Sequence, residues 1–260
     1  MSRLASKFAE LRAAGRAGLV TYITAGDPTP AISCDVLRAI ATAGADVLEV
    51  GVPFSDPIAD GPVIQRATER AMAAGGNLTV TLDMIASLRA EIAQPIVLFT
   101  YVNPVLQMGV DTFVARAASA GVDGVLLLDL PIEESADMCG RLAARDIDQI
   151  FLISPTTTPA RVAVAASLGR GFLYVISRLG VTGARAQVSG SAAPLVERIR
   201  AATSLPIAVG FGLSRPEHLA EVGGYADAAV VGSALVTVIG DAGIDAPAKA
   251  GAFVRWLRGA

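Results

Sequence analysis

Alternating strand-like and helix-like segments predict an α/β fold, a single (β/α)₈ TIM barrel with an additional N-terminal helix. Short runs rich in Val, Ile and Leu alternate with longer segments rich in Ala, Leu and Arg, in which apolar residues recur at helical spacing. Gly and Pro follow several of the short runs and end them. The 260 residues match the size of one such barrel, about 250 residues, and no linker rich in Ser, Gly or Pro divides them. We therefore expect one domain over residues 1–260.

The pattern places eight strands along the chain, each followed by a helical stretch. They are expected near residues 19–24, 46–51, 96–101, 124–129, 148–153, 172–176, 206–210 and 228–231. Residues 1–15 form an amphipathic helix with Leu4, Phe8 and Leu11 on one face, and not a signal peptide with an uninterrupted apolar stretch. The longest apolar run, residues 228–240, is shorter than the ~20 residues of a membrane-spanning helix. These features predict a cytoplasmic protein.

The composition argues against several classes of function. A net charge of −3, from 21 basic and 24 acidic residues spread along the chain, provides no basic face for nucleic acid. Cys34 and Cys139 are far apart and lack CxxC spacing, so we expect reduced, buried thiols. The only lysines, Lys7 and Lys249, lie near the ends of the chain, where no barrel strand can use them as a Schiff-base amine. The single histidine, His218, is expected half-exposed on a helix.

Without a His/Cys cluster for zinc or a strand followed by GxGxxG, the chemistry is expected to use carboxylates and no cofactor. In the second strand, Leu48 and Val50 share one face, toward the helices, and Glu49 points into the barrel. Burial would raise its pKa and let it give and take a proton near neutral pH. The structural alternative is pairing with an interior Arg, but no predicted strand contains one.

The loop GVPFSDPIADGP follows this strand on the C-terminal rim, where barrel enzymes place their active sites. Asp60 in this loop is either a functional carboxylate or the N-cap of a helix that begins near Pro62. Asp56 is interpreted as a turn or interface residue.

Two glycine-rich turns, GFGLS at 210–214 and VGSALV at 231–236, follow the seventh and eighth strands and predict a phosphate site. Gly210, Gly212 and Gly232 would let the backbone approach an anion closely. Residues 177–190 suit a mobile lid with flexible points at Gly180 and Gly183, and a disordered loop without function is the alternative.

These motifs resemble those of the tryptophan synthase alpha chain family. LEVGVPFSDPIADGP at 48–62 is similar to the family signature, and the likeness continues through ITAGDP, YVNP, SRLGVTGAR, AVGFGLS and VVGSALV in this order. It covers essentially the whole chain.

The resemblance implies cleavage of indole-3-glycerol phosphate to indole and glyceraldehyde 3-phosphate. It assigns Glu49 to proton transfer at the ring carbon and the side-chain hydroxyl, and Asp60 to the indole N–H. It implies an α₂β₂ heterotetramer with a beta chain that carries pyridoxal phosphate (PLP). It places phosphate contacts at Gly183, Gly212, Gly232 and Ser233, a lid threonine at Thr182, and pocket aromatics at Tyr22, Tyr101, Tyr174 and Phe211.

Two positions depart from the family pattern, Tyr22 where Phe is usual and Leu128 where many relatives carry Pro or Ala. Both concern the shape of the pocket. Three other functions remain open at this point. They are another phosphate-binding barrel such as an isomerase, a non-catalytic activator of the beta chain, and a stand-alone lyase that releases free indole. The first normally needs a Lys, Cys or His or a different arrangement of carboxylates, and the second is disfavoured by the presence of both Glu49 and Asp60.

Overall fold

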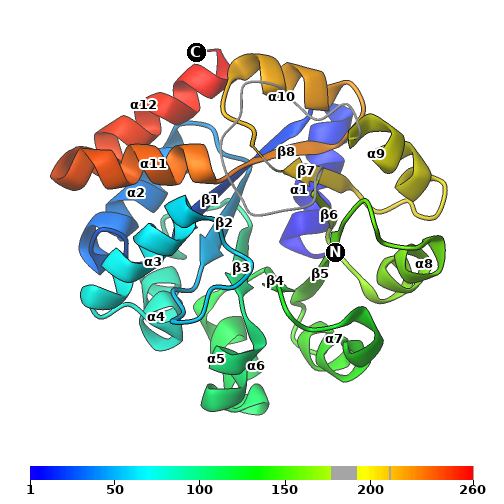
Figure 1. Cartoon of the computed structure of the whole chain (residues 1–260), viewed down its shortest axis with the longest axis horizontal. Helices are drawn as coiled ribbons and strands as arrows, with labels where there is room; N and C mark the ends of the chain where they lie inside the picture. Colours follow the sequence, from blue (N-terminus) through cyan, green and yellow to red (C-terminus); the bar gives the residue numbers. More distant parts are fainter. Residues whose placement is uncertain (177–191, 211, 260) are drawn as a thin grey trace.

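The computed structural model, which describes residues 1–176, 192–210 and 212–259, contains a closed barrel of eight parallel strands in sequence order. Helices surround the strands on the outside (Figure 1). The strands are β1 (Gly18–Thr24), β2 (Val47–Gly51), β3 (Ile96–Thr100), β4 (Gly124–Leu127), β5 (Asp148–Ile153), β6 (Leu173–Ile176), β7 (Ile207–Gly210) and β8 (Ala228–Val231). The predicted fold class is therefore confirmed.

The strand boundaries agree with the sequence pattern within two residues. The largest difference is in β4, which ends at Leu127, so Leu128 and Asp129 belong to a turn. The N–H of Leu128 still donates to the carbonyl of Thr100 at 3.0 Å, which explains why the apolar run continues past the strand.

The helices pack on the outer face of the barrel, with α12 against both α2 and α11 (Figure 1). They are α1 (Arg3–Ala13), α2 (Pro30–Thr42), α3 (Pro62–Ala73), α4 (Leu78–Leu88), α5 (Val102–Met108), α6 (Val110–Ala120), α7 (Ala136–Ala143), α8 (Pro159–Leu168), α9 (Ala192–Arg200), α10 (Pro216–Gly223), α11 (Ser233–Ala242) and α12 (Ala246–Arg258), with short 3₁₀ turns η1 (Ile132–Glu134) and η2 (Gly243–Asp245). Proline occupies the first or second position of five of them, α2, α3, α8, α10 and α12, where its missing N–H costs nothing.

Helix α1 closes the N-terminal end of the barrel. Its Leu4, Phe8 and Leu11 are buried, as the amphipathic pattern predicted, in one cluster with residues that the strands point inward. The rings of Phe8 and Phe172 lie 5.5 Å apart. Because apolar side chains fill this end, the space that a ligand can enter lies at the other end.

The larger apolar cluster lies between the strands and the helices and includes Leu48 and Val50. Side chains alternate along a strand, so the burial of these two residues against the helices directs Glu49 between them into the barrel.

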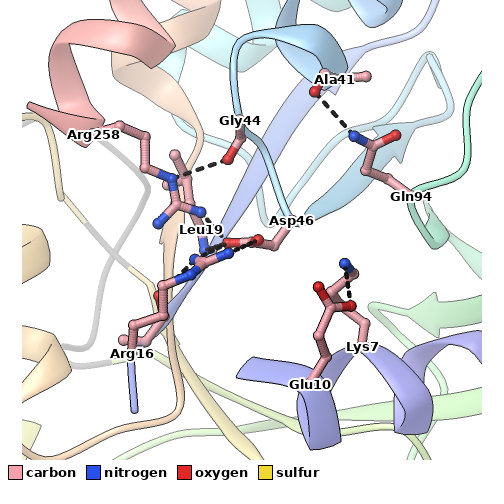
Figure 2. Close-up of polar contacts among 10 residues, drawn as sticks. Lys7, Glu10, Arg16, Leu19, Ala41, Gly44, Asp46, Gln94 and Arg258 are labelled. Carbon is pink, nitrogen blue, oxygen red and sulfur yellow. Dashed lines mark hydrogen bonds and ion pairs between the residues drawn. The ribbon is translucent and has the colours of Figure 1, made fainter. Parts of the chain in front are cut away.

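Aspartates immediately before β2, β4 and β8 join each of these strands to its neighbour. Asp46 donates its N–H to the carbonyl of Leu19 at 2.9 Å, and its carboxylate accepts the N–H of Leu19 at 2.8 Å. The same carboxylate binds Arg16 and Arg258, so it ties the ends of β1, β2 and α12 together (Figure 2). Equivalent pairs of hydrogen bonds join Asp123 to Ile96 and Asp227 to Ile207.

Two minor sequence predictions were wrong. His218 is buried, not half-exposed, because its Nδ1 accepts the N–H of Ser214 at 3.1 Å and fixes the turn before α10. Cys34 is only partly buried, whereas Cys139 is buried, and both are free thiols. No helix in the described ranges is long and apolar enough to cross a membrane.

Candidate active site

A cavity of about 320 Å³ opens at the C-terminal ends of the barrel strands. It brings together side chains from β1, β2, β3, β5, β6 and β8 and from the loops that follow β2, β4, β7 and β8. Its lining comprises Tyr22, Glu49, Ile58, Ala59, Asp60, Ile64, Phe99, Leu128, Leu152, Tyr174, Ile176, Gly212, Leu213, Val230, Gly232, Ser233 and Ala234. Apolar residues dominate this list, and two carboxylates are placed among them.

Glu49 is the more deeply buried carboxylate, with 1% of its surface exposed. Its Oε1 has no hydrogen-bond partner among the described residues. Burial raises the pKa of Glu49 to about 8. The carboxyl is therefore largely protonated at neutral pH, and a small change in its surroundings can ionise it.

Asp60 is held at the end of the loop after β2. Its Oδ2 accepts the hydroxyl of Tyr101 at 3.1 Å, and the same Tyr101 oxygen accepts the N–H of Ala59 at 3.0 Å. Phe54 packs on the ring of Tyr101, with centroids 5.2 Å apart. Burial raises the pKa of Asp60 to about 6, although the hydrogen bond from Tyr101 acts to lower it.

The capping interpretation of Asp60 is wrong. Gly61, and not Asp60, is the N-cap of α3, and it has no side chain that could cap the helix. The Asp60 carboxylate points instead into the cavity, while its backbone carbonyl accepts the side-chain amide of Gln65 at 2.9 Å. Asp56, four residues earlier, is exposed and does not line the cavity.

Backbone donors lie at another part of the cavity. Gly232 is the N-cap of α11, and Ser233 and Ala234 are its first two helical residues, whose N–H groups have no partner within the helix. Gly212, with φ of +81°, adopts a conformation that favours glycine. The helix dipole and these N–H groups favour an anion at this end.

Two tyrosines form walls of the cavity in a similar way. The Tyr22 hydroxyl lies over Gly51 of the next strand, and the Tyr174 hydroxyl lies over Gly210 of the next strand. Gly210 therefore makes room for a phenol and does not line the cavity, unlike its predicted role beside an anion. Burial raises the pKa of both phenols well above the ordinary value, so both stay neutral.

Several apolar lining residues were not predicted from the sequence, among them Phe99, Leu152 and Ile64. Phe99 and Leu152 share the period-two signal that revealed Glu49, so the inward positions of the strands could have identified them. Leu128 and Tyr22, the two departures from the family pattern, both line the cavity. The predicted residues Thr182, Gly183 and Phe211, and the predicted lid at 177–190, lie outside the described residues. The described ranges contain no group of three or more His, Cys, Asp or Glu placed to hold a metal ion.

Comparison with known proteins identifies the family. A family model described as "Tryptophan synthase alpha chain" matches residues 8–254. The chain belongs to the tryptophan synthase alpha chain family. The resemblance stated from the motifs alone is thereby confirmed.

Individual alpha chains are similar over nearly their whole length. The alpha chain of Methylococcus capsulatus is 51% identical over 240 residues, 92% of this chain and 90% of that protein. That of Solibacter usitatus is 48% identical over 239 residues, with the same coverage. The crystal structure of tryptophan synthase subunit alpha from Legionella pneumophila superposes with a TM-score of 0.92 at 36% identity, covering 100% of this chain and 98% of the other.

Proposed function

We propose that this chain cleaves indole-3-glycerol phosphate to indole and glyceraldehyde 3-phosphate, as the alpha subunit of tryptophan synthase. The observation that carries the proposal is the pair of buried carboxylates, Glu49 and Asp60, on a cavity that also holds the N-terminus of α11. An apolar ring fits among Phe99, Leu128 and Leu152, and a phosphate fits the backbone donors.

Glu49 acts first as an acid and then as a base. Its raised pKa keeps the proton on the carboxyl at neutral pH, and this proton goes to ring carbon C3 of the substrate. The resulting carboxylate takes the proton of the neighbouring side-chain hydroxyl. The bond between C3 and the hydroxyl-bearing carbon breaks, its electron pair returns to the ring, and an aldehyde forms. Glu49 ends the cycle protonated, as it began.

Asp60 supports the ring during these steps. Protonation at C3 leaves positive charge at the ring nitrogen, and an ionised carboxylate that accepts the N–H stabilises that charge. Its pKa of about 6 leaves Asp60 mostly ionised at neutral pH while Glu49 is mostly protonated. Two carboxyl groups in one cavity thus have different protonation states and can take different roles.

The phosphate group is assigned to Gly212, Gly232 and Ser233, together with Gly183 from the segment outside the described residues. Tyr22, Tyr101, Tyr174 and Phe211 are assigned to the substrate pocket and Thr182 to the lid.

We further propose that the reaction needs no cofactor on this chain, and that PLP belongs to the beta chain of an α₂β₂ heterotetramer. One domain over residues 1–260 and a cytoplasmic location complete the proposal. The similarity to a solved tryptophan synthase structure from Mycobacterium tuberculosis, at 38% identity and a TM-score of 0.89, supports the relation to that enzyme.

The test measures indole release from indole-3-glycerol phosphate by the isolated chain. Glu49→Gln and Asp60→Asn each keep the shape of the side chain but remove proton transfer or charge, so both should lose activity by at least about 100-fold. Asp56→Asn makes the same chemical change at an exposed position of the same loop and should leave the rate unaltered. Full turnover by Glu49→Gln would refute the acid/base role.

A further inference from the structure

The position of Tyr22 in the cavity is not explained by hydrophobic packing alone. It pairs with Glu49 in the register of β1 and β2, and both side chains point inward. Its ring packs edge-on against Phe99, with centroids 5.3 Å apart and planes at 75°. The base of the side chain lies near Gly232, so the ring extends from the anion-binding end of the cavity toward the carboxylates.

The hydroxyl of Tyr22 reaches the top of β2. A Cβ added to Gly51 would lie 2.2 Å from this oxygen, so the glycine leaves the space that the hydroxyl occupies. Burial first, and then the charge of Asp60, raise the pKa of the phenol well above its ordinary value, while the Thr24 hydroxyl acts to lower it and the charge of Glu49 adds to the rise. The hydroxyl therefore stays neutral and keeps a proton to donate while it lies near both carboxylates.

Asp60 has capacity for a further donor. An ionised carboxylate accepts about four hydrogen bonds, but within the described ranges the Asp60 side chain accepts only the Tyr101 hydroxyl. At 3.1 Å that contact is longer than the common O–H···O distance of about 2.8 Å. Among the described residues, the titratable groups near Asp60 and the Tyr22 hydroxyl are Glu49 from β2, Tyr101 after β3 with Asp129 beside it, and Tyr174 from β6 in the same cavity.

We propose that Tyr22 is a positioning residue whose hydroxyl donates a second hydrogen bond to the Asp60 carboxylate when the 52–61 loop closes over bound substrate. The proposal rests on the function proposed above and adds a role for the phenol oxygen. Tyr101 and Tyr22 would then hold the carboxylate from two sides, in its ionised form and against the ring nitrogen.

The substitution Tyr22→Phe isolates the oxygen, because the ring contacts with Phe99 and Gly232 remain. Loss of a donor to the ionised form raises the pKa of a carboxyl group. Because the proposed hydrogen bond forms in the substrate complex, the acid limb of the kcat profile should therefore move to higher pH by about 0.5 to 1 unit, which is roughly a 3- to 10-fold loss of rate on that limb. KM on the plateau should change little.

The experiment compares kcat from pH 5 to 9 for the wild type and three phenylalanine variants. Tyr101→Phe is the positive control, because it removes the observed donor to Asp60. Tyr225→Phe is the matched negative control, because it removes a buried phenol oxygen that lies outside the cavity and has no partner in the described part of the chain. An upward shift in Tyr22→Phe and Tyr101→Phe, but not in Tyr225→Phe, supports the proposal.

Two results would overturn it. In the first, the acid limb of Tyr22→Phe coincides with that of the wild type, while that of Tyr101→Phe moves. In the second, Tyr22→Phe changes only KM, at every pH, which would show that Tyr22 contributes only packing to the cavity wall. Both presuppose that the wild type cleaves indole-3-glycerol phosphate. A wild type without that activity would refute the proposed function itself and is recognised before any variant is compared.

Discussion

Glu49 costs the protein stability, since its carboxyl lies in an apolar cavity with one oxygen unpaired among the described residues. Burial raises its pKa from 4.5 to about 8. A carboxyl group with a raised folded-state pKa contributes its full stability below the unfolded value and loses it as pH rises toward the folded value. The wild type should therefore become less stable between about pH 4.5 and 8, by at most about 1.4 kcal/mol per pH unit.

Glu49→Gln should remove this dependence. The amide does not ionise, so the variant should gain stability relative to the wild type as the pH rises from 5 to 8. Urea unfolding of both proteins at these two pH values measures the difference. If the difference in the free energy of unfolding between the two proteins is the same at pH 5 and pH 8, Glu49 is not held in its neutral form.

The rate should depend on the protonation states of Glu49 and Asp60. Ring protonation needs protonated Glu49, so activity should fall as pH rises through about 8. Charge stabilisation needs ionised Asp60, so activity should also fall as pH drops through about 6. The resulting bell-shaped profile of kcat/KM belongs to the pair, because the two groups share one cavity. A rate that keeps rising above pH 9 would assign Glu49 a purely basic role.

Gly212 is the residue at which the proposed anion site can be tested by backbone strain. At φ of +81° any side chain is strained, by roughly 1 to 2 kcal/mol, and Gly212 lines the cavity in which the phosphate is proposed to bind. Gly212→Ala should raise KM at least several-fold. Gly15→Ala imposes similar strain at φ of +64°, has open space around it and lies outside the cavity. If both variants show the same KM by indole-release kinetics, the phosphate does not contact Gly212.

At this scale the sequence could identify inward-pointing residues but not their partners. Period-two alternation located Glu49, because a strand has only two faces. It could not show that Tyr101 binds Asp60, since 41 residues separate them and the contact depends on how the loop folds. His218 was predicted wrongly for a similar reason. Its acceptor role depends on the turn at Ser214, which helical spacing does not reveal.

Among the structural elements, the starts of β1 and β2 and the end of α12 depend on Asp46 (Figure 2). Burial acts to raise the pKa of Asp46, but hydrogen bonds from Arg16 and the Leu19 N–H and the charge of Arg258 hold it below its ordinary value. Asp46→Asn would leave two guanidinium groups without their anion. We expect a loss of about 2 kcal/mol in the free energy of unfolding at pH 7.

The pH dependence of this loss follows from the lowered pKa. Such a carboxylate contributes its stability above its unfolded pKa and loses it as pH falls through the folded value. The difference between wild type and Asp46→Asn should therefore shrink below about pH 4. Asp35→Asn, which breaks the exposed pair with Arg38, serves as control and should cost at most about 0.5 kcal/mol in urea unfolding. An equal loss in the two variants would contradict the structural role of Asp46.

The elements themselves were largely predictable. All eight strands are short buried runs between turn residues, and the local pattern suffices to locate such runs. The aspartate pairs were not predicted, because Asp46, Asp123 and Asp227 resemble ordinary turn residues in the sequence. Their function depends on the parallel neighbour, such as Leu19 or Ile96, which only the barrel topology defines.

On the scale of the whole molecule, one side of the rim is suited to a partner. Large exposed apolar residues lie there on the 52–61 loop, at the end of α3 and on α5, namely Ile58, Met72 and Leu106. A groove beside them is lined by Phe54, Met72 and residues of α5. The loop that carries Asp60 therefore borders both the cavity and this surface, so a protein bound there can alter the position of the carboxylate.

We expect the beta chain from the same organism to accelerate indole release by stabilising the closed 52–61 loop. The effect is limited by its differential affinity for the open and closed states, and a typical coupling of about 1 to 3 kcal/mol corresponds to roughly 5- to 150-fold in rate. Leu106→Asp, at a 59% exposed position outside the cavity, should leave the rate of the isolated chain unchanged and require more beta chain for half-maximal activation.

The measurement is indole release by the purified chain, titrated with the beta chain. Free serine is left out of the assay so that indole is not consumed. Val164→Asp places the same charge on α8 at a 41% exposed position and should respond like the wild type. If Leu106→Asp and Val164→Asp give the same titration curve, the partner binds elsewhere on the rim. If the isolated chain is fast and the beta chain has no effect at saturating concentration, the carboxylates are already in place, and the chain is a stand-alone lyase that releases free indole.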